Sequence, residues 1–92
     1  MTAEWDLVGF VVSSKYRVAV LRRLVESPAT PTRIATDVDV AVTHVSRALR
    51  ELRERDLAQL LVAEERKKGR VYAVSERGTE IWSLIETRDI VR

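Results

Sequence analysis

The chain contains no cysteine and only one histidine among its 92 residues. The absence of cysteine excludes disulfide bonds, thiolate metal sites and thiol redox switches. His44 alone cannot build a metal site, although carboxylates could in principle join it as ligands. We therefore expect neither a bound metal nor any other cofactor.

Long hydrophobic runs are also missing. No apolar run approaches the roughly 18 residues expected of a membrane span. The first residues, MTAEWD, are acidic where the start of a signal peptide would be basic. These two features predict a cytoplasmic protein without a membrane partner.

Catalytic patterns are absent as well. The sequence shows no Gly-rich loop that could cradle a phosphate and no Ser/His/acid arrangement with a residue to orient it. We therefore expect that the protein is not an enzyme. A bound metal found by elemental analysis would reopen the enzyme reading.

The charge balance is nearly neutral but uneven along the chain. The 92 residues suit one domain, and 46% apolar with 33% charged residues is typical of a globular protein. The formal net charge of +2 does not by itself indicate a nucleic-acid partner. Residues 1–14 contain no Lys or Arg, whereas residues 43–70 contain eight basic against five acidic residues. Thirteen of the sixteen basic residues are Arg, which favours bidentate recognition, although genomic composition could explain the same bias.

The stretch TPTRIATDVDVAVTHVSRALRELRERDL, residues 30–57, predicts two short helices joined by a tight turn. On the second helix the apolar side chains share one face: Val42, Val45, Leu49 and Leu52. The opposite face and its flanks hold polar and basic side chains: Thr43, His44, Ser46, Arg47, Arg50 and Glu54. Such a face suits a helix in the DNA major groove, where Arg can donate two hydrogen bonds to guanine.

Two further helices are predicted before this stretch. Residues 4–12 (EWDLVGFVV) are dense in apolar side chains; periodicity does not separate helix from strand there, and we interpret them as a short helix. Ser14 can cap the next helix, which extends through Glu26. Pro28 ends that helix because proline disfavours the α conformation in the preceding residue. The expected core stripe of the second helix is Tyr16, Val20, Leu21, Leu24 and Val25.

The helix pair has a clear start. Thr30 supplies a cap, and Pro31 occupies the first helical position, where its missing N–H costs nothing. The second helix begins near Ala41 and extends to about residue 55. Because Ala41 is a poor cap, Asp39 or Thr43 is expected to serve its first turn. The inward-pointing side chains of the first helix are Ile34, Ala35 and Val38.

A hairpin and a last helix complete the chain. Residues 59–65 (QLLVAEE) and 70–75 (RVYAVS) are rich in Val, Leu and Tyr and flank a turn that contains Gly69, which predicts a β-hairpin. Ser75 can cap a C-terminal helix at about 76–90. The order of elements predicts a mainly α fold with a small β-hairpin (α+β): a winged helix-turn-helix with N- and C-terminal helices. It forms a single domain, 1–92, with the helix-turn-helix at about 31–55 and the wing at about 59–75.

The segment 30–57 resembles the helix-turn-helix of archaeal and bacterial ArsR/MarR-like winged-helix transcription regulators. The resemblance rests on THVSRALREL, followed by a loop, a basic hairpin and a closing VSERG, and it covers the chain from Ser13 to Ile85. It implies sequence-specific binding of double-stranded DNA, usually by a homodimer on a two-fold symmetric operator. It also implies that the helix at 41–55 enters the major groove and that the hairpin tip reaches the neighbouring minor groove or backbone.

Two features depart from the family pattern. Ala41 stands where the family often has Ser or Thr. The Cys or clustered His ligands of ArsR-type metal sensors are missing, so the resemblance does not imply metal sensing here.

The residues expected to contact DNA lie on the helix pair and the hairpin. Arg47 is the expected base reader and Arg50 is a candidate phosphate contact. Simpler readings remain open, because Arg47 could merely pair with Glu51 one turn later and a charged hairpin tip could serve solubility alone. The full set of candidates is Thr32, Thr43, His44, Ser46, Arg47, Arg50, Arg66, Lys67, Lys68 and Arg70.

The resemblance places a dimer contact on the terminal helices. Both terminal segments hold more apolar side chains than one three-helix core needs. For either Trp, burial in the core of one chain is an equally open alternative. The candidates are Trp5, Phe10, Ile81, Trp82, Ile85 and Ile90.

Two other classes of function remain alternatives. A winged helix can serve as a protein-interaction module of the transcription machinery, in which case DNA binding would be weak. A non-specific architectural DNA-binding protein would bind all sequences alike. Substitution of Arg47 separates these from a sequence reader.

Overall fold

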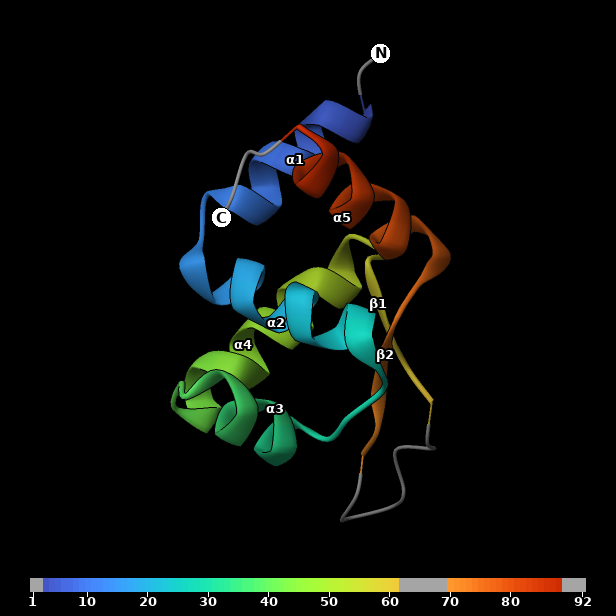
Figure 1. The fold of residues 1–92 in the computed structure, drawn as a ribbon. Helices are drawn as coiled ribbons and strands as arrows, with labels where there is room; N and C mark the ends of the chain where they lie inside the picture. The colour runs from blue at the N-terminus through green and yellow to red at the C-terminus, as the bar shows by residue number, and fades with distance from the viewer. Residues whose placement is uncertain (1–2, 62–69, 89–92) are drawn as a thin grey trace.

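The computed structural model describes residues 3–61 and 70–88 (Figure 1). Along the described chain, helices and strands follow in the order α1, α2, α3, α4, β1, β2, α5. Their bounds are α1 Ala3–Val12, α2 Lys15–Glu26, α3 Pro31–Val38, α4 Val42–Glu54, β1 Ala58–Leu60, β2 Tyr72–Val74 and α5 Glu76–Thr87. The predicted mainly helical fold with a small antiparallel hairpin is confirmed. The C-terminal helix ends at Thr87, earlier than the predicted residue 90.

Local capping explains where three of the helices begin. The side chain of Ser14 accepts from the backbone N–H of Arg17, that of Thr30 from Arg33, and that of Ser75 from Gly78. These satisfy donors that the first turn of a helix otherwise leaves unpaired, so the three predicted caps are confirmed. The start of α4 is different: Ala41 precedes it, and no side chain caps it. Asp39, expected as a possible cap for α4, instead ends α3 in the left-handed conformation, with φ of 57°.

The helices lie in layers, and the core lies between them. Figure 1 shows α1 and α5 side by side at one end and α3 and α4 at the other, with α2 crossing between them. The largest fully buried side chains lie between these layers: Val11, Val20, Leu21, Leu24, Ile34, Val45, Leu49, Leu52, Leu57, Ile81 and Ile85. The predicted stripes are therefore mostly correct.

One predicted core position needs correction. Val42 is 41% exposed, because it is the first residue of α4 and extends past the packed turns that hold Val45 and Leu49. Tyr16 and Val25 are partly buried and pack against the core, as Ala35 and Val38 of α3 also do.

The hairpin is joined to the helix-turn-helix by a contact that the sequence analysis missed. Within the ladder, Ala58 pairs with Val74 and Leu60 with Tyr72. On the other edge of β2, Ala29 forms an isolated antiparallel bridge with Tyr72, through N–H···O bonds of 3.0 and 2.9 Å. This bridge fixes the base of the wing beside the start of α3. The predicted tip residues Arg66, Lys67 and Lys68 lie outside the described residues.

The apolar side chains of α5 are packed within one chain. Ile81, Trp82 and Ile85 are all buried, and they share a core cluster with Leu7 and Val11 of α1. Within one chain these three side chains are therefore core residues, and their part in a dimer contact stays a prediction. The apolar side chains of α1 and α5 thus belong to one core. Ile90, a further candidate, lies outside the described residues.

Candidate nucleic-acid interface

The predicted division of α4 into two faces agrees with the structure. Val45, Leu49 and Leu52 are buried against the core. The candidate DNA-contacting residues of this helix are all exposed: Thr43, His44, Ser46, Arg47 and Arg50. Their exposure makes them available to a ligand, while their individual roles remain predictions.

One groove joins three elements of the helix-turn-helix and the wing. It has a volume of about 530 Å³ and lies between the start of α3, the outer face of α4 and the start of β2. It brings together Ser46, Arg50 and Arg70, which the sequence analysis had selected separately. The complete lining is Pro31, Ser46, Arg50, Arg53, Glu54, Arg70 and Tyr72. Three guanidinium groups against one carboxylate give this groove a positive charge, which suits a phosphate backbone.

Arg53 is a groove residue that the list of candidates omitted. Its guanidinium carbon lies 6.0 Å from the centroid of the Tyr72 ring, so the side chain extends from α4 toward the wing. Its position three residues after Arg50 placed it on a neighbouring face of the helix. The spacing of three residues from Arg50 is the sequence feature that could have identified Arg53 as a candidate.

His44 and Arg47 lie at a second hollow, on the side of α4 that faces α2. This hollow has a volume of about 250 Å³. The His44 imidazole is stacked on the Tyr16 ring, with centroids 4.3 Å apart and an angle of 4° between the planes. Tyr16 thus holds the imidazole against α2, a contact that the sequence analysis did not predict.

Glu51 connects the exposed face of α4 to α2. Its carboxylate accepts a hydrogen bond of 2.8 Å from Nη1 of Arg17. The second oxygen lies 3.5 Å from Nε of Arg47, the partner predicted from the spacing of four residues. The Arg17 guanidinium, and secondarily the charge of Arg47, hold the pKa of Glu51 below its ordinary value of 4.5.

This ion pair predicts a pH-dependent contribution to stability. Because the folded-state pKa of Glu51 is lowered, its carboxylate stabilises the fold above the unfolded-state pKa, and this contribution is lost as the pH falls through the folded-state pKa. Glu51→Gln should therefore lower the free energy of unfolding at pH 7, and the difference from wild type should shrink between about pH 5 and pH 3. Urea unfolding at several pH values measures it. Glu80→Gln, a change to an exposed carboxylate on α5, is the control; equal pH profiles for the two variants would contradict the prediction.

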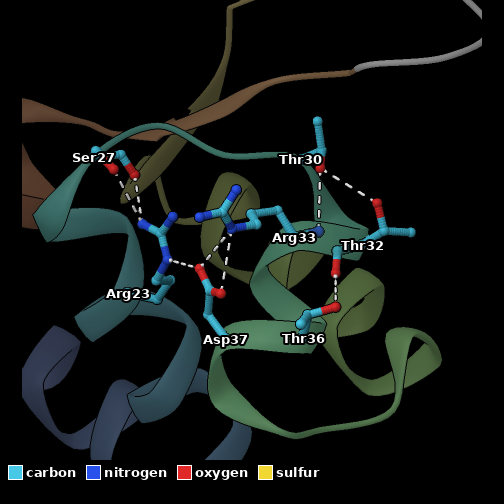
Figure 2. A network of polar contacts seen from close by, with 7 residues as sticks. All are labelled: Arg23, Ser27, Thr30, Thr32, Arg33, Thr36 and Asp37. Carbon is cyan, nitrogen blue, oxygen red and sulfur yellow. Dashed lines mark hydrogen bonds and ion pairs between the residues drawn. The ribbon is translucent and has the colours of Figure 1, made fainter.

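A polar network fixes α3, which carries the candidate Thr32 at its start (Figure 2). Arg23 of α2 and Arg33 of α3 both reach the Asp37 carboxylate, at 2.9 and 3.1 Å. Arg23, followed by Arg33, holds the pKa of Asp37 below its usual value. At the other end of α3, the hydroxyl oxygens of Thr30 and Thr32 are 3.3 Å apart. The ion pair between Arg23 and Asp37 therefore joins α3, which carries the exposed Thr32, to α2.

A family model described as the HVO_A0261 N-terminal domain matches residues 5–89. The chain belongs to this family. No curated protein sequence matches it. Of the described helices, none has the length and apolar character needed to cross a membrane. Among residues 3–61 and 70–88, no group of three or more His, Cys, Asp or Glu side chains is arranged to hold a metal ion.

Solved structures share the fold across most of the chain. The reduced transcriptional regulator YodB from B. subtilis has a TM-score of 0.79 at 14% identity, over 98% of this chain and 89% of that one. The MarR family transcription regulator SP03579 gives 0.74 at 20% identity, over 84% of this chain and 52% of that one.

A third structure is the homodimeric winged helix-turn-helix DNA-binding domain Mb0332 from Mycobacterium bovis, a possible ArsR-family regulator. It has a TM-score of 0.74 at 17% identity, over 94% of this chain and 78% of that one. At these identities the likeness shows the fold, and the predicted ArsR/MarR-type winged helix-turn-helix is confirmed at that level. The chain spans about half the length of SP03579.

Proposed function

We propose that the protein is a sequence-specific regulator of transcription that binds double-stranded DNA. The observation that carries this proposal is the groove in which Arg50, Arg53 and Arg70 gather beside the exposed face of α4. A phosphate backbone supplies the negative charge that such a groove attracts, and a helix face that carries Arg and Thr can reach base edges. The fold supports the proposal, since the similar Mb0332 is described as a DNA-binding domain.

The residues take different roles in this proposal. Arg47 and Thr43, both exposed on α4, read base edges in the major groove. Arg50 and Arg70 contact phosphates, and Ser46 lines the same groove. Thr32, in the first turn of α3, contacts the DNA backbone. His44 remains a candidate for a base or phosphate contact, and the wing residues Arg66, Lys67 and Lys68 remain predicted phosphate contacts.

A homodimer is the form proposed to bind DNA. Trp5 is 46% exposed on α1, with the Arg88 guanidinium carbon 5.2 Å from its ring centroid. Phe10 is only partly buried, with two guanidinium groups over its ring, so Trp5 is the better candidate for the contact. This contact lies at the end of the molecule away from α3 and α4 (Figure 1). A two-fold pair could then place its α4 helices about one DNA turn, roughly 34–36 Å, apart.

Fluorescence-anisotropy binding tests the proposal. A duplex from the region upstream of the gene is compared with a scrambled duplex over a series of salt concentrations. We expect binding to the upstream duplex to be about 10³-fold tighter, with a steep salt dependence. Equal binding to both duplexes would favour an architectural protein, and no binding at low salt would favour a protein-interaction module.

Two substitutions separate base reading from phosphate contact. Arg47→Ala should cost about 1–3 kcal/mol on the preferred duplex and reduce the preference over the scrambled one. Arg50→Ala should weaken both duplexes alike and lower the log–log salt slope by roughly 0.9. Arg77→Ala removes an exposed guanidinium from α5 and serves as the matched control. Unchanged affinity in Arg47→Ala would overturn its assignment as a base reader.

A further inference from the structure

We infer that Arg17 is a positioning residue that keeps Arg47 available to DNA by holding Glu51 away from it. The inference deepens the proposed function and rests on it, since it concerns DNA binding through α4. Arg17 was not among the residues that the sequence analysis selected.

All sides of the Arg17 guanidinium are engaged. It donates from Nη1 to Glu51, from Nε to the carbonyl oxygen of Phe10 and from Nη2 to Oγ of Ser13, each at 2.8 Å. Its carbon also lies 4.1 Å from the centroid of the Phe10 ring. The side chain is 15% exposed. Each of the three guanidinium nitrogens thus donates one hydrogen bond within the chain, and Arg17 is anchored at the junction of α1 and α2.

Arg47, in contrast to Arg17, is exposed and weakly paired. Its side chain is 70% exposed, and its contact with Glu51 is a long one of 3.5 Å through Nε. Among the described residues, no hydrogen bond engages its two terminal nitrogens, and its shortest approach to the Glu51 carboxylate is through Nε. Those nitrogens are the ones that a guanine edge needs for a bidentate contact. Arg47 is therefore poised for a ligand because the stronger pairing of Glu51 is with Arg17.

Removal of Arg17 changes the partner of Glu51. The carboxylate would keep its charge and would have Arg47, four residues earlier on the same helix, as its neighbouring cation. A full ion pair between them would occupy the terminal nitrogens, and DNA would have to displace the carboxylate. An exposed pair of this kind is worth less than about 1 kcal/mol, which corresponds to a loss of about two- to fivefold in DNA affinity.

A purely structural role for Arg17 predicts something else. Because Arg17 joins α2 to Phe10 and Ser13, its loss could loosen the fold and weaken DNA binding whatever residue stands at position 51. Arg17→Met keeps an apolar stem beside the Phe10 ring and removes the charge. A cycle of single and double substitutions then separates the two roles.

The experiment measures anisotropy binding of the upstream duplex by wild type and by the single variants Arg17→Met, Glu51→Gln and Arg47→Ala. It also measures Arg17→Met combined with each of the other two. We expect Arg17→Met to weaken binding about two- to fivefold, and Glu51→Gln to leave it unchanged or tighter. In the Glu51→Gln background, and separately in the Arg47→Ala background, Arg17→Met should have no effect. Arg22→Met, which removes another α2 guanidinium, is the matched control and should not change binding.

The possible results distinguish failure of the inference from failure of the proposed function. If wild type binds DNA and the Arg17→Met loss persists in either background, the inference is overturned and Arg17 is structural. If Arg17→Met alone has no effect, the inference is also overturned, while the proposed function stands. If wild type binds no duplex, the proposed function fails and the inference fails with it. Thermal unfolding of each variant confirms that the compared proteins are folded.

Discussion

Trp82→Ala is expected to lower the free energy of unfolding by about 3–5 kcal/mol. The Trp82 side chain is 4% exposed and belongs to the same core cluster as Leu7 and Val11 of α1. Truncation removes a large apolar side chain and leaves a cavity that the surrounding helices close only in part. Since single domains are stable by about 5–15 kcal/mol, this loss is a large fraction of the free energy of unfolding. Urea unfolding at pH 7 measures the loss.

Trp5→Ala is the matched control for this prediction. The Trp5 ring is 46% exposed, so its removal should cost about 1 kcal/mol or less in the isolated chain. It should instead shift the monomer–dimer balance toward monomer in analytical ultracentrifugation. If Trp82→Ala hardly changed the unfolding free energy but dissociated a dimer, Trp82 would be an interface residue and its burial within one chain would be incorrect.

The features that the sequence predicted well are local ones. Ser14, Thr30 and Ser75 cap their helices through bonds to residues three positions later, so each motif is complete within one short segment. The faces of α4 likewise follow from the period of the helix alone. The fold class followed because these elements occur in an order that few architectures share.

The features that the sequence did not predict depend on distant segments. An apolar surplus in both terminal helices was visible, but only the structure shows that Ile81 and Trp82 of α5 are buried in one core cluster with side chains of α1. Arg17 and Glu51 are 34 residues apart, and no periodicity links them. Ala29 and Tyr72, which form the isolated bridge, are even further apart in the sequence. For the candidate site, the sequence identified Arg50 and its neighbours singly, whereas their meeting in one groove required the packing of α3, α4 and β2.

Gly78→Ala should destabilise the protein even though alanine is the better helix former. Gly78 lies in the first turn of α5, and a Cβ there would overlap the Leu57 carbonyl oxygen and lie 2.7 Å from Cγ2 of Val74. The Leu57 carbonyl cannot move away easily, because it accepts a 3.0 Å hydrogen bond from the Ser75 N–H. Overpacking of this kind costs about 2 kcal/mol or more, which lowers the melting temperature by roughly 10 °C in a domain of this size.

Gly9→Ala tests the same substitution where nothing obstructs it. Gly9 lies within α1, and apart from its own stretch of helix nothing lies within 4 Å of the position that a Cβ would take. Helix propensity alone should therefore act there and stabilise the fold by about 0.5–1 kcal/mol. Opposite signs for the two variants in thermal unfolding would show that the close approach of α5 to Leu57, rather than backbone flexibility, requires glycine at position 78. Stabilisation by both would mean that the start of α5 can move away from the Leu57 carbonyl, and that the VSERG segment does not fix the angle between the wing and the last helix.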